Sequence, residues 1–233
     1  MFELNPQMEI TAVVDIGPNG RNALVIDNFY ENPNEVRDLA LKIPRRTNVN
    51  FVNHPTGSRA VYETNELRKN LEKLCEELLS DKDHWGRETD MPFLRSNMGL
   101  MWFMIDYMNE KVIDEDPMRL VPYQCWYEHN PSPFQFTMDI FLNTEKECFG
   151  GINIWNFAGK TSIVEDIKNM YADKTKFDIR KDIYNSKFTW AREMTFGMKY
   201  NRAVILPADI LKGDILDTAH FHDVDRIAQK LFL

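Results

Sequence analysis

Long apolar runs and a basic leader segment are both missing from this chain. No stretch approaches the ~20 consecutive apolar residues that a transmembrane helix needs. The first residues, Met1–Pro6, do not form a basic segment followed by an apolar run. We therefore expect a soluble protein that is not secreted and has no membrane partner.

Cysteine is scarce, with only Cys75, Cys125 and Cys148 among 233 residues. The number is odd and no two of these residues form a close pair, so a disulfide framework is not expected. A reducing compartment fits this cysteine usage.

Clusters of Lys and Arg are also missing, and the net charge is −8. A nucleic-acid groove needs a basic surface, so nucleic acid is not expected to be the main partner. The sequence shows no internal repeat and no low-complexity segment, while 43% of its residues are hydrophobic. A chain of this size can bury about 70% of its unfolded surface, so residues 1–233 are predicted to form one domain.

The N-terminal part, residues 23–95, is predicted to contain a strand and two helices. Residues 23–26 form a short apolar run that ends in a polar turn, as strands do. Apolar residues recur at helical spacing over 33–43 and again over 65–79. Both helices are expected to support a sheet.

The C-terminal part, residues 97–233, is predicted to be rich in strands. Residues 134–142 alternate between apolar and polar side chains, the period-two pattern of a strand with one buried face. Gly150-Gly151 predicts a hairpin-like turn into the next strand, and residues 157–199 are polar enough to form an insertion. The chain is thus predicted to be mainly β with flanking helices, of the α+β class.

Several short stretches of the C-terminal half resemble one oxygenase superfamily. They are Pro122-Tyr123-Gln124, Asp139–Asn143, Cys148–Gly151, Tyr200-Asn201-Arg202 and Arg226–Phe232. They are similar to the 2-oxoglutarate and Fe(II)-dependent dioxygenases of the prolyl-4-hydroxylase-like type, especially to a small bacterial and phage group. The resemblance implies a double-stranded β-helix over residues 97–233, a jelly-roll or cupin-like barrel of two antiparallel sheets. Fe(II) and 2-oxoglutarate are the cofactors that it implies.

The iron ligands of that superfamily are not preserved at the matching positions. Such enzymes hold Fe(II) by two His and one carboxylate, and the family has His-x-Asp where this chain has Tyr127-Glu128-His129. The second, distal His of the family corresponds to Lys212. A phenol and an ammonium group would each have to lose a proton with a pKa of about 10 to bind iron. A degenerate iron site is therefore expected.

His220 and His222 provide a second metal-binding hypothesis. Their His-x-His spacing is compatible with a pair of metal ligands, which His129 could join. Alternatively, both side chains lie solvated in a polar turn before the last strand.

The residues that bind 2-oxoglutarate in the family have closer matches in this chain than the iron ligands do. Arg226 corresponds to the basic residue on the last strand, which in the family clamps the distal carboxylate of 2-oxoglutarate. An Arg fork suits this task because it can bind a carboxylate through two hydrogen bonds. Asn143, Tyr200 and Lys212 are further candidates for the cosubstrate pocket.

Arg226 also has a structural alternative, a salt bridge with Asp223 or Asp225. Strand alternation puts Lys230 on the same face as Arg226. A lysine that faces a barrel interior is costly unless it is paired or wet. We therefore expect either a polar interior or a last strand that leaves the barrel early.

Three functions remain open from the sequence. In the first, the chain is an oxygenase-like protein with a degenerate iron site that acts as a binding or structural module for a protein partner, for example in a phage particle. In the second, it is an active 2-oxoglutarate-dependent hydroxylase with an unusual ligand set. In the third, it is a metal-free binder of a small carboxylate or phosphate through Arg226 and Lys212. The expected location is the cytoplasm of a bacterium or an infected host cell, with the virion as an alternative, and a homo-oligomer is compatible with each function.

Overall fold

The structure is a computed structural model of the 233-residue chain. It describes residues 1–17, 20–44, 58–63, 69–70, 102–124, 136–158, 167, 169–185, 189–215, 220–222 and 224–232. The helix predicted over 65–79 lies outside these residues, apart from the helical pair 69–70. Tyr127 and His129 lie outside them as well.

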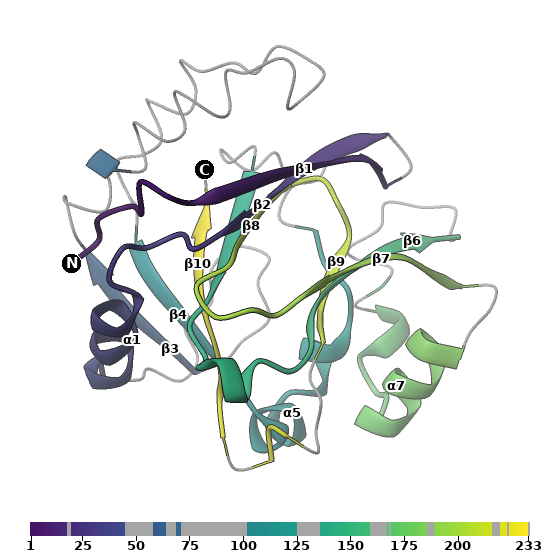
Figure 1. The fold of residues 1–233 in the computed structure, drawn as a ribbon. Coiled ribbons are helices and arrows are strands. Elements are labelled where there is room, and N and C mark those ends of the chain that lie inside the picture. Colours follow the sequence, from purple (N-terminus) through teal and green to yellow (C-terminus); the bar gives the residue numbers. More distant parts are fainter. Residues whose placement is uncertain are drawn as a thin grey trace.

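Strands make up most of the regular structure in the described part of the chain (Figure 1). They are β1 (Glu9–Ile16), β2 (Arg21–Asp27), β3 (Ser58–Glu63), β4 (Trp102–Met108), β5 (Phe136–Phe141), β6 (Gly151–Phe157), β7 (Trp190–Gly197), β8 (Ala203–Pro207), β9 (Lys212–Ile215) and β10 (Arg226–Phe232). The α-helices are α1 (Pro33–Lys42), α5 (Glu110–Glu115) and α7 (Lys176–Asn185), with short 3-10 helices η2 (Pro117–Leu120) and η3 (Glu145–Glu147). The prediction of a mainly β protein with flanking helices is confirmed. No helix among the described residues has the length and apolar character that crossing a membrane requires.

The strands form two antiparallel sheets. The larger sheet has seven strands in the order β1-β2-β8-β5-β10-β4-β3, and the smaller has three in the order β7-β6-β9. Beside β9, Tyr123 pairs with Lys212 through two backbone hydrogen bonds of 2.8 and 2.9 Å. This contact extends the smaller sheet by one bridge on the side of β9.

The hairpin predicted at Gly150-Gly151 is wrong, because β5 and β6 belong to different sheets. Both glycines have positive φ, +90° at Gly150 and +146° at Gly151. A Cβ at Gly151 would lie 2.0 Å from the backbone oxygen of Phe196, on the strand paired with β6. The two glycines therefore let the chain leave the larger sheet and enter the smaller one at close range.

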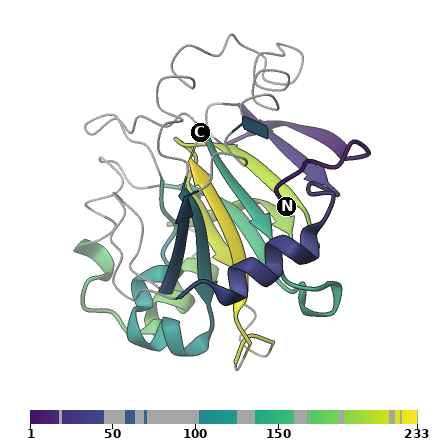
Figure 2. The same ribbon diagram turned by 90° about the vertical axis from the view of Figure 1, so that its left-hand side faces the viewer.

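Helix α1 covers the outer face of the larger sheet (Figure 2). Pro33 occupies its first turn, where a missing N–H costs nothing. Val36 and Ala40 are fully buried against apolar side chains of the sheet. Those side chains include Met138 and Ile140 of β5, so one face of this strand belongs to the core under α1.

A second core lies between the two sheets. Phe141 and Val204 from the larger sheet share one cluster of buried side chains with Ile152, Ile154 and Phe196 from the smaller sheet. The sheets therefore pack on each other, and central strands such as β5 are buried on both faces.

The excursion between β6 and β7 is shorter than predicted from the sequence. The range 157–199 contains α7, but it also contains β7, which pairs along β6. Helix α7 packs through a third core with α5, η2 and two tryptophans, Trp155 and Trp190. Glu110 of α5 accepts hydrogen bonds from Lys176 and Arg180 of α7 at 2.7 and 3.0 Å, which fixes α7 beside α5.

Candidate functional site

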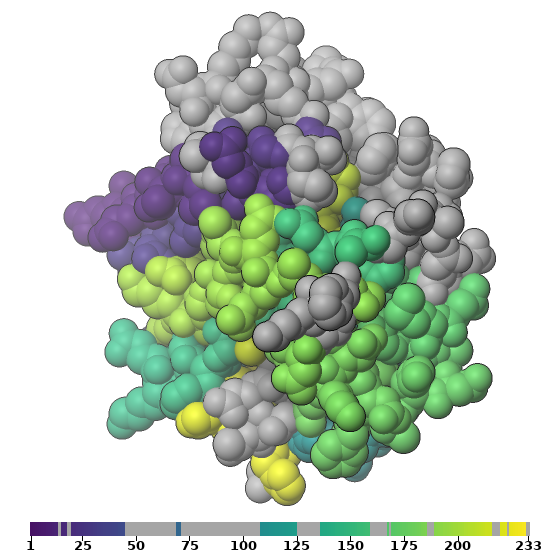
Figure 3. All heavy atoms as spheres, turned by 90° about the vertical axis from the view of Figure 1, so that its right-hand side faces the viewer, coloured from purple at the N-terminus to yellow at the C-terminus, as the bar shows by residue number. Residues whose placement is uncertain are grey.

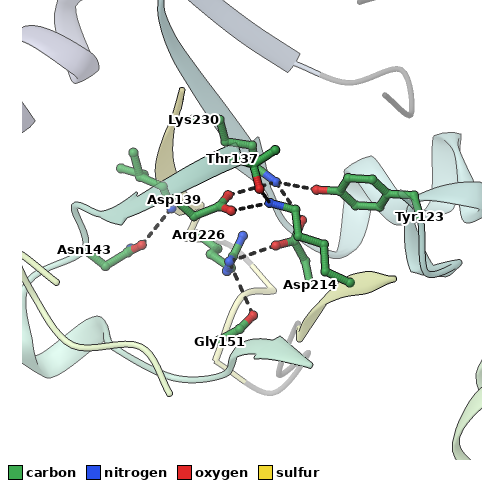
Figure 4. Close-up of polar contacts among 10 residues, drawn as sticks. Tyr123, Thr137, Asp139, Asn143, Gly151, Asp214, Arg226 and Lys230 are labelled. Atoms are coloured by element: carbon green, nitrogen blue, oxygen red, sulfur yellow. Dashed lines mark hydrogen bonds and ion pairs between the residues drawn. The ribbon is translucent and has the colours of Figure 1, made fainter. Parts of the chain in front are cut away.

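Charged side chains lie buried between the two sheets. They come from three strands. The two residues from β9 and the two from β10 are an even number of positions apart, so each strand directs both of its side chains to the same side. The charged residues are Asp139 of β5, Lys212 and Asp214 of β9, and Arg226 and Lys230 of β10. None of them is more than 8% exposed. We call these five residues the interior ion network (Figure 4).

The first part of the network joins β9 to β5. The Lys212 ammonium lies 2.5 Å from Asp139 Oδ2 and 2.9 Å from the Thr137 hydroxyl. Lys212 is held here because its backbone pairs with Tyr123 on one side and Ile154 on the other. A protonated amine with an aspartate partner is the form that this geometry stabilises.

The second part joins β10 to β9. Lys230 Nζ lies 3.1 Å from Asp214 Oδ2 and 3.3 Å from Asp139 Oδ1, so it bridges both carboxylates of the network. Arg226 Nη2 lies 3.0 Å from Asp214 Oδ1. Three cationic side chains thus share two carboxylates, which offsets part of the cost of burying these charges.

Tyr123 places a phenol beside the two lysines. Its hydroxyl accepts a hydrogen bond of 3.0 Å from Lys230. The Lys230 and Lys212 ammonium groups also lie 5.6 and 5.8 Å from the centre of its ring, within cation–π range. Burial raises the pKa of the Tyr123 phenol to about 12, although the two ammonium groups act in the opposite direction. The phenol is therefore neutral at physiological pH.

Arg226 is fully buried, yet part of its guanidinium meets no hydrogen-bond acceptor within the described part of the chain. Nη2 meets Asp214 and, at 3.4 Å, the backbone oxygen of Gly151. Nε and Nη1 have no hydrogen-bond partner among the described residues, and the group lies 5.4 Å from the ring centre of Phe141. Buried donors in folded proteins usually have an acceptor, so these two nitrogens are an exception.

Lys212, Arg226 and Lys230 were singled out from the sequence, but their partners Asp139 and Asp214 were not. The pattern of 134–142 suggested that Thr137 and Asp139 face solvent, whereas both are buried between the sheets. The signal for Asp214 was its two-residue spacing from Lys212, which puts both on one face of a strand.

Arg226 has an acidic partner that the salt-bridge alternative did not name. Within the part of the chain that the structure describes, Arg226 pairs with Asp214 of the facing sheet. Asp225 instead accepts a hydrogen bond of 2.7 Å from the Asn109 side chain, and Asp223 lies outside the described residues. Arg226 therefore points between the sheets rather than back into its own turn.

Asn143 and Tyr200 do not join the interior ion network. The Asn143 side chain accepts a 2.7 Å hydrogen bond from the backbone N–H of Ile227 and donates one of 2.8 Å to the backbone oxygen of Asp225. The Tyr200 hydroxyl donates to Asn34 at the start of α1, on the outer side of the larger sheet. Of the four cosubstrate candidates, the structure brings only Lys212 and Arg226 together.

His220 and His222 are exposed in the turn before β10. The ring of His220 stacks on Phe149, with centroids 3.4 Å apart. Among the residues that the structure describes, no three His, Cys, Asp or Glu side chains are grouped so that they could hold a metal ion. The predicted involvement of His129 falls outside those residues and stays a prediction.

No family model matches the chain, and no curated protein matches it.

Proposed function

We propose that this protein is an oxygenase-like double-stranded β-helix in which the interior ion network replaces the iron centre, and that it acts as a binding module without oxygenase chemistry. The observation that carries the proposal is the ion pair of Lys212 with Asp139 between the sheets. Lys212 is the residue that corresponds to the distal iron-binding His of the resembled superfamily.

The order of strands supports this fold. From β5 onward the chain visits the larger sheet, then the smaller with β6 and β7, the larger with β8, the smaller with β9 and the larger with β10. A double-stranded β-helix winds in this way, with strands that alternate between two facing sheets on either side of one hairpin, here β6 and β7. The bridge between Tyr123 and Lys212 adds the beginning of a further strand next to β9.

The described residues at this site do not fit Fe(II). Lys212, Lys230 and Arg226 bring three positive charges into a volume from which bulk water is excluded, where charge repulsion is weakly screened. The carboxylates Asp139 and Asp214 are already engaged by these cations. A dication would have to displace ion pairs that hold the two sheets together, so these side chains are unsuited to an iron centre.

Anaerobic titration of the chelator-treated protein with Fe(II) and 2-oxoglutarate tests the proposal. When 2-oxoglutarate chelates Fe(II) in a protein site, the complex has a visible charge-transfer band. We expect no band, and no rise in melting temperature that depends on the metal. A band with one-to-one stoichiometry, together with succinate formation that is lost in His129→Ala, would establish the active hydroxylase instead.

Arg226 favours a more specific version of this function, the binding of a small carboxylate or phosphate. Its Nε and Nη1 meet no acceptor among the described residues, although the side chain is fully buried. An oxyanion beside Nε or Nη1 would supply an acceptor there, and Arg binds such groups through its planar array of donors.

Thermal shift and calorimetric titration with succinate, 2-oxoglutarate and inorganic phosphate test this version. We expect stabilisation by at least one of them, without added metal, and loss of the effect in Arg226→Lys, which keeps the charge but not the fork. Arg202→Lys is the matched control, because Arg202 pairs with Asp27 near the surface, away from the network. Equal responses in the wild type and in Arg226→Lys would count against the anion site.

A further inference from the structure

Strand β1 forms one edge of the seven-stranded sheet. It pairs along β2, from Glu9 opposite Asp27 to Val13 opposite Ala23. Within the described part of the chain, no strand pairs with its other side. With respect to that part of the chain, the outward N–H and C=O groups of β1 are a template for another strand.

The exposed edge is neutral and rich in β-branched residues. Five consecutive residues, Ile10–Val14 with the sequence Ile-Thr-Ala-Val-Val, carry no charge and no proline. Ile10 is 37% exposed, and Thr11 and Ala12 are exposed as well. Figure 3 shows β1 and β2, in purple, projecting from the body of the molecule.

Other edges in this protein carry charges that discourage such pairing. Strand β7, at the edge of the smaller sheet, has Arg192 and Glu193 in its middle, both exposed. Strand β3, at the opposite edge of the larger sheet, contains Arg59 and ends at Glu63. Charged residues on edge strands are a common protection against association, and the centre of β1 lacks this protection.

We propose that β1 is a homodimerisation edge, which pairs antiparallel with β1 of a second copy to give one continuous sheet across both molecules. A two-fold axis through Thr11 would place Ile10 opposite Ala12 and Glu9 opposite Val13. This register keeps Glu9 away from Asp15, the other acidic residue of the strand, so no like charges face each other. Because each copy offers the same neutral stretch, the edge is complementary to itself.

The chain bends away from this pairing at Asp15. Asp15 has a φ of 58°, and the register of β1 with β2 shifts between Val13 and Ile16. Beyond the shift, the Gly17 N–H donates to Glu193 of β7 at 2.7 Å. The self-complementary stretch is thus limited to about the length of Ile10–Val14. The proposed interface is therefore short and joins two copies, and it does not continue along a longer strand.

The mass of the protein in solution, measured by light scattering and sedimentation over a range from nanomolar to high micromolar, tests this proposal. We expect a shift from 27.5 kDa to twice that value as the concentration rises. Thr11→Lys places two ammonium groups face to face on the axis and is expected to raise the dimer dissociation constant about tenfold or more. Ala191→Lys, an exposed position on the edge strand β7, is the matched control and is expected to dimerise like the wild type.

Hydrogen exchange of residues 9–16 identifies the surface that is used. We expect protection of β1 amides in the concentrated wild type and its loss in Thr11→Lys, with an unchanged melting profile for the monomer. A wild type that remains monomeric at every concentration overturns the proposal. A dimer that persists in Thr11→Lys with rapid exchange in β1 also overturns it, because association would then involve another surface.

Discussion

The ammonium group of Lys212 on β9 lies 2.5 Å from the carboxylate of Asp139 on β5, so a buried ion pair joins the two sheets. Neither side chain is more than 5% exposed. Burying such a pair has a desolvation cost that can match its attraction, but removing one partner leaves a buried charge. The pair therefore favours one alignment of the sheets over others more than it adds net stability.

Loss of one member of this pair is expected to be strongly destabilising. Asp139→Asn removes the carboxylate that Lys212 and Lys230 share, and we expect the unfolding free energy to fall by about 3–5 kcal/mol. Urea denaturation followed by tryptophan fluorescence measures this change. Lys199→Met is the control, because Lys199 is half exposed in its ion pair with Asp27 and should cost about 0–1 kcal/mol.

Replacing both members by apolar or neutral residues is expected to cost less than the sum of the two single changes. The double variant Asp139→Asn/Lys212→Met removes both charges of the pair, so neither residue leaves an unpaired charge on the other sheet. A coupling free energy of about 1 kcal/mol or more in this double-mutant cycle is the expected result. Strict additivity would show that the two groups do not interact in solution.

Asn143 is expected to contribute to the stability of the fold. Its side chain makes two hydrogen bonds to the backbone before and at the start of β10 and is fully buried. Asn143→Ala should lower the unfolding free energy by about 1–3 kcal/mol, because backbone groups lose their partners. Tyr200→Phe removes an exposed hydrogen bond to Asn34 and should change the unfolding free energy by less than about 0.5 kcal/mol. Chemical denaturation of both variants checks the difference.

Gly151 is expected to tolerate no side chain. A Cβ there would lie 2.0 Å from Phe196 O, and the φ of +146° disfavours other residues. Gly151→Ala should therefore lower the melting temperature sharply or prevent folding. Gly197→Ala is the matched control from the paired strand, because its Cβ would meet nothing within 4 Å. Equal effects of the two substitutions would show that Gly151 is not in tight contact.

Asp27 is expected to contribute stability that depends on pH. A hydrogen bond from Arg202, assisted by Lys199, lowers the pKa of Asp27 below its ordinary value of 3.8, despite the opposing effect of burial. A lowered pKa in the folded state means that the contribution is present above pH 3.8 and is lost as the pH falls through the folded value. Asp27→Asn should thus be less stable than the wild type at neutral pH, and the two should converge in acid. Urea midpoints measured from strongly acidic to neutral pH test this.

Local sequence patterns were sufficient to predict much of the fold. Alternation identified the strand at 134–142, and helical spacing identified α1, because both depend on neighbours within a few residues. The same alternation predicted that Lys230 shares the face of Arg226, which left two alternatives, a polar interior or a last strand that leaves the barrel early. The contacts of Lys230 with Asp139 and Asp214 correspond to the first alternative, a polar interior.

The pairing of charges across the sheets was not accessible in this way. Asp139 and Lys212 are 73 positions apart, and nothing local indicates which acidic residue a buried lysine will meet. Polar residues on a strand usually face water, so the alternation over 134–142 predicts exposed side chains at Thr137 and Asp139, whereas both are buried. Likewise, Gly150-Gly151 resembles a hairpin turn until the close contact with Phe196 shows that it serves a change of sheet.

The central place of β10 has a consequence for how the protein is made. Strand β10 inserts between β5 and β4, although its residues leave the ribosome after the other nine strands of the described chain. Until β10 is available, the larger sheet cannot form between β5 and β4, and Asp139 has no contact with Lys230. Nascent chains would expose unpaired strand edges during that interval, so folding of the larger sheet is expected to be completed only after residues 226–232 have emerged.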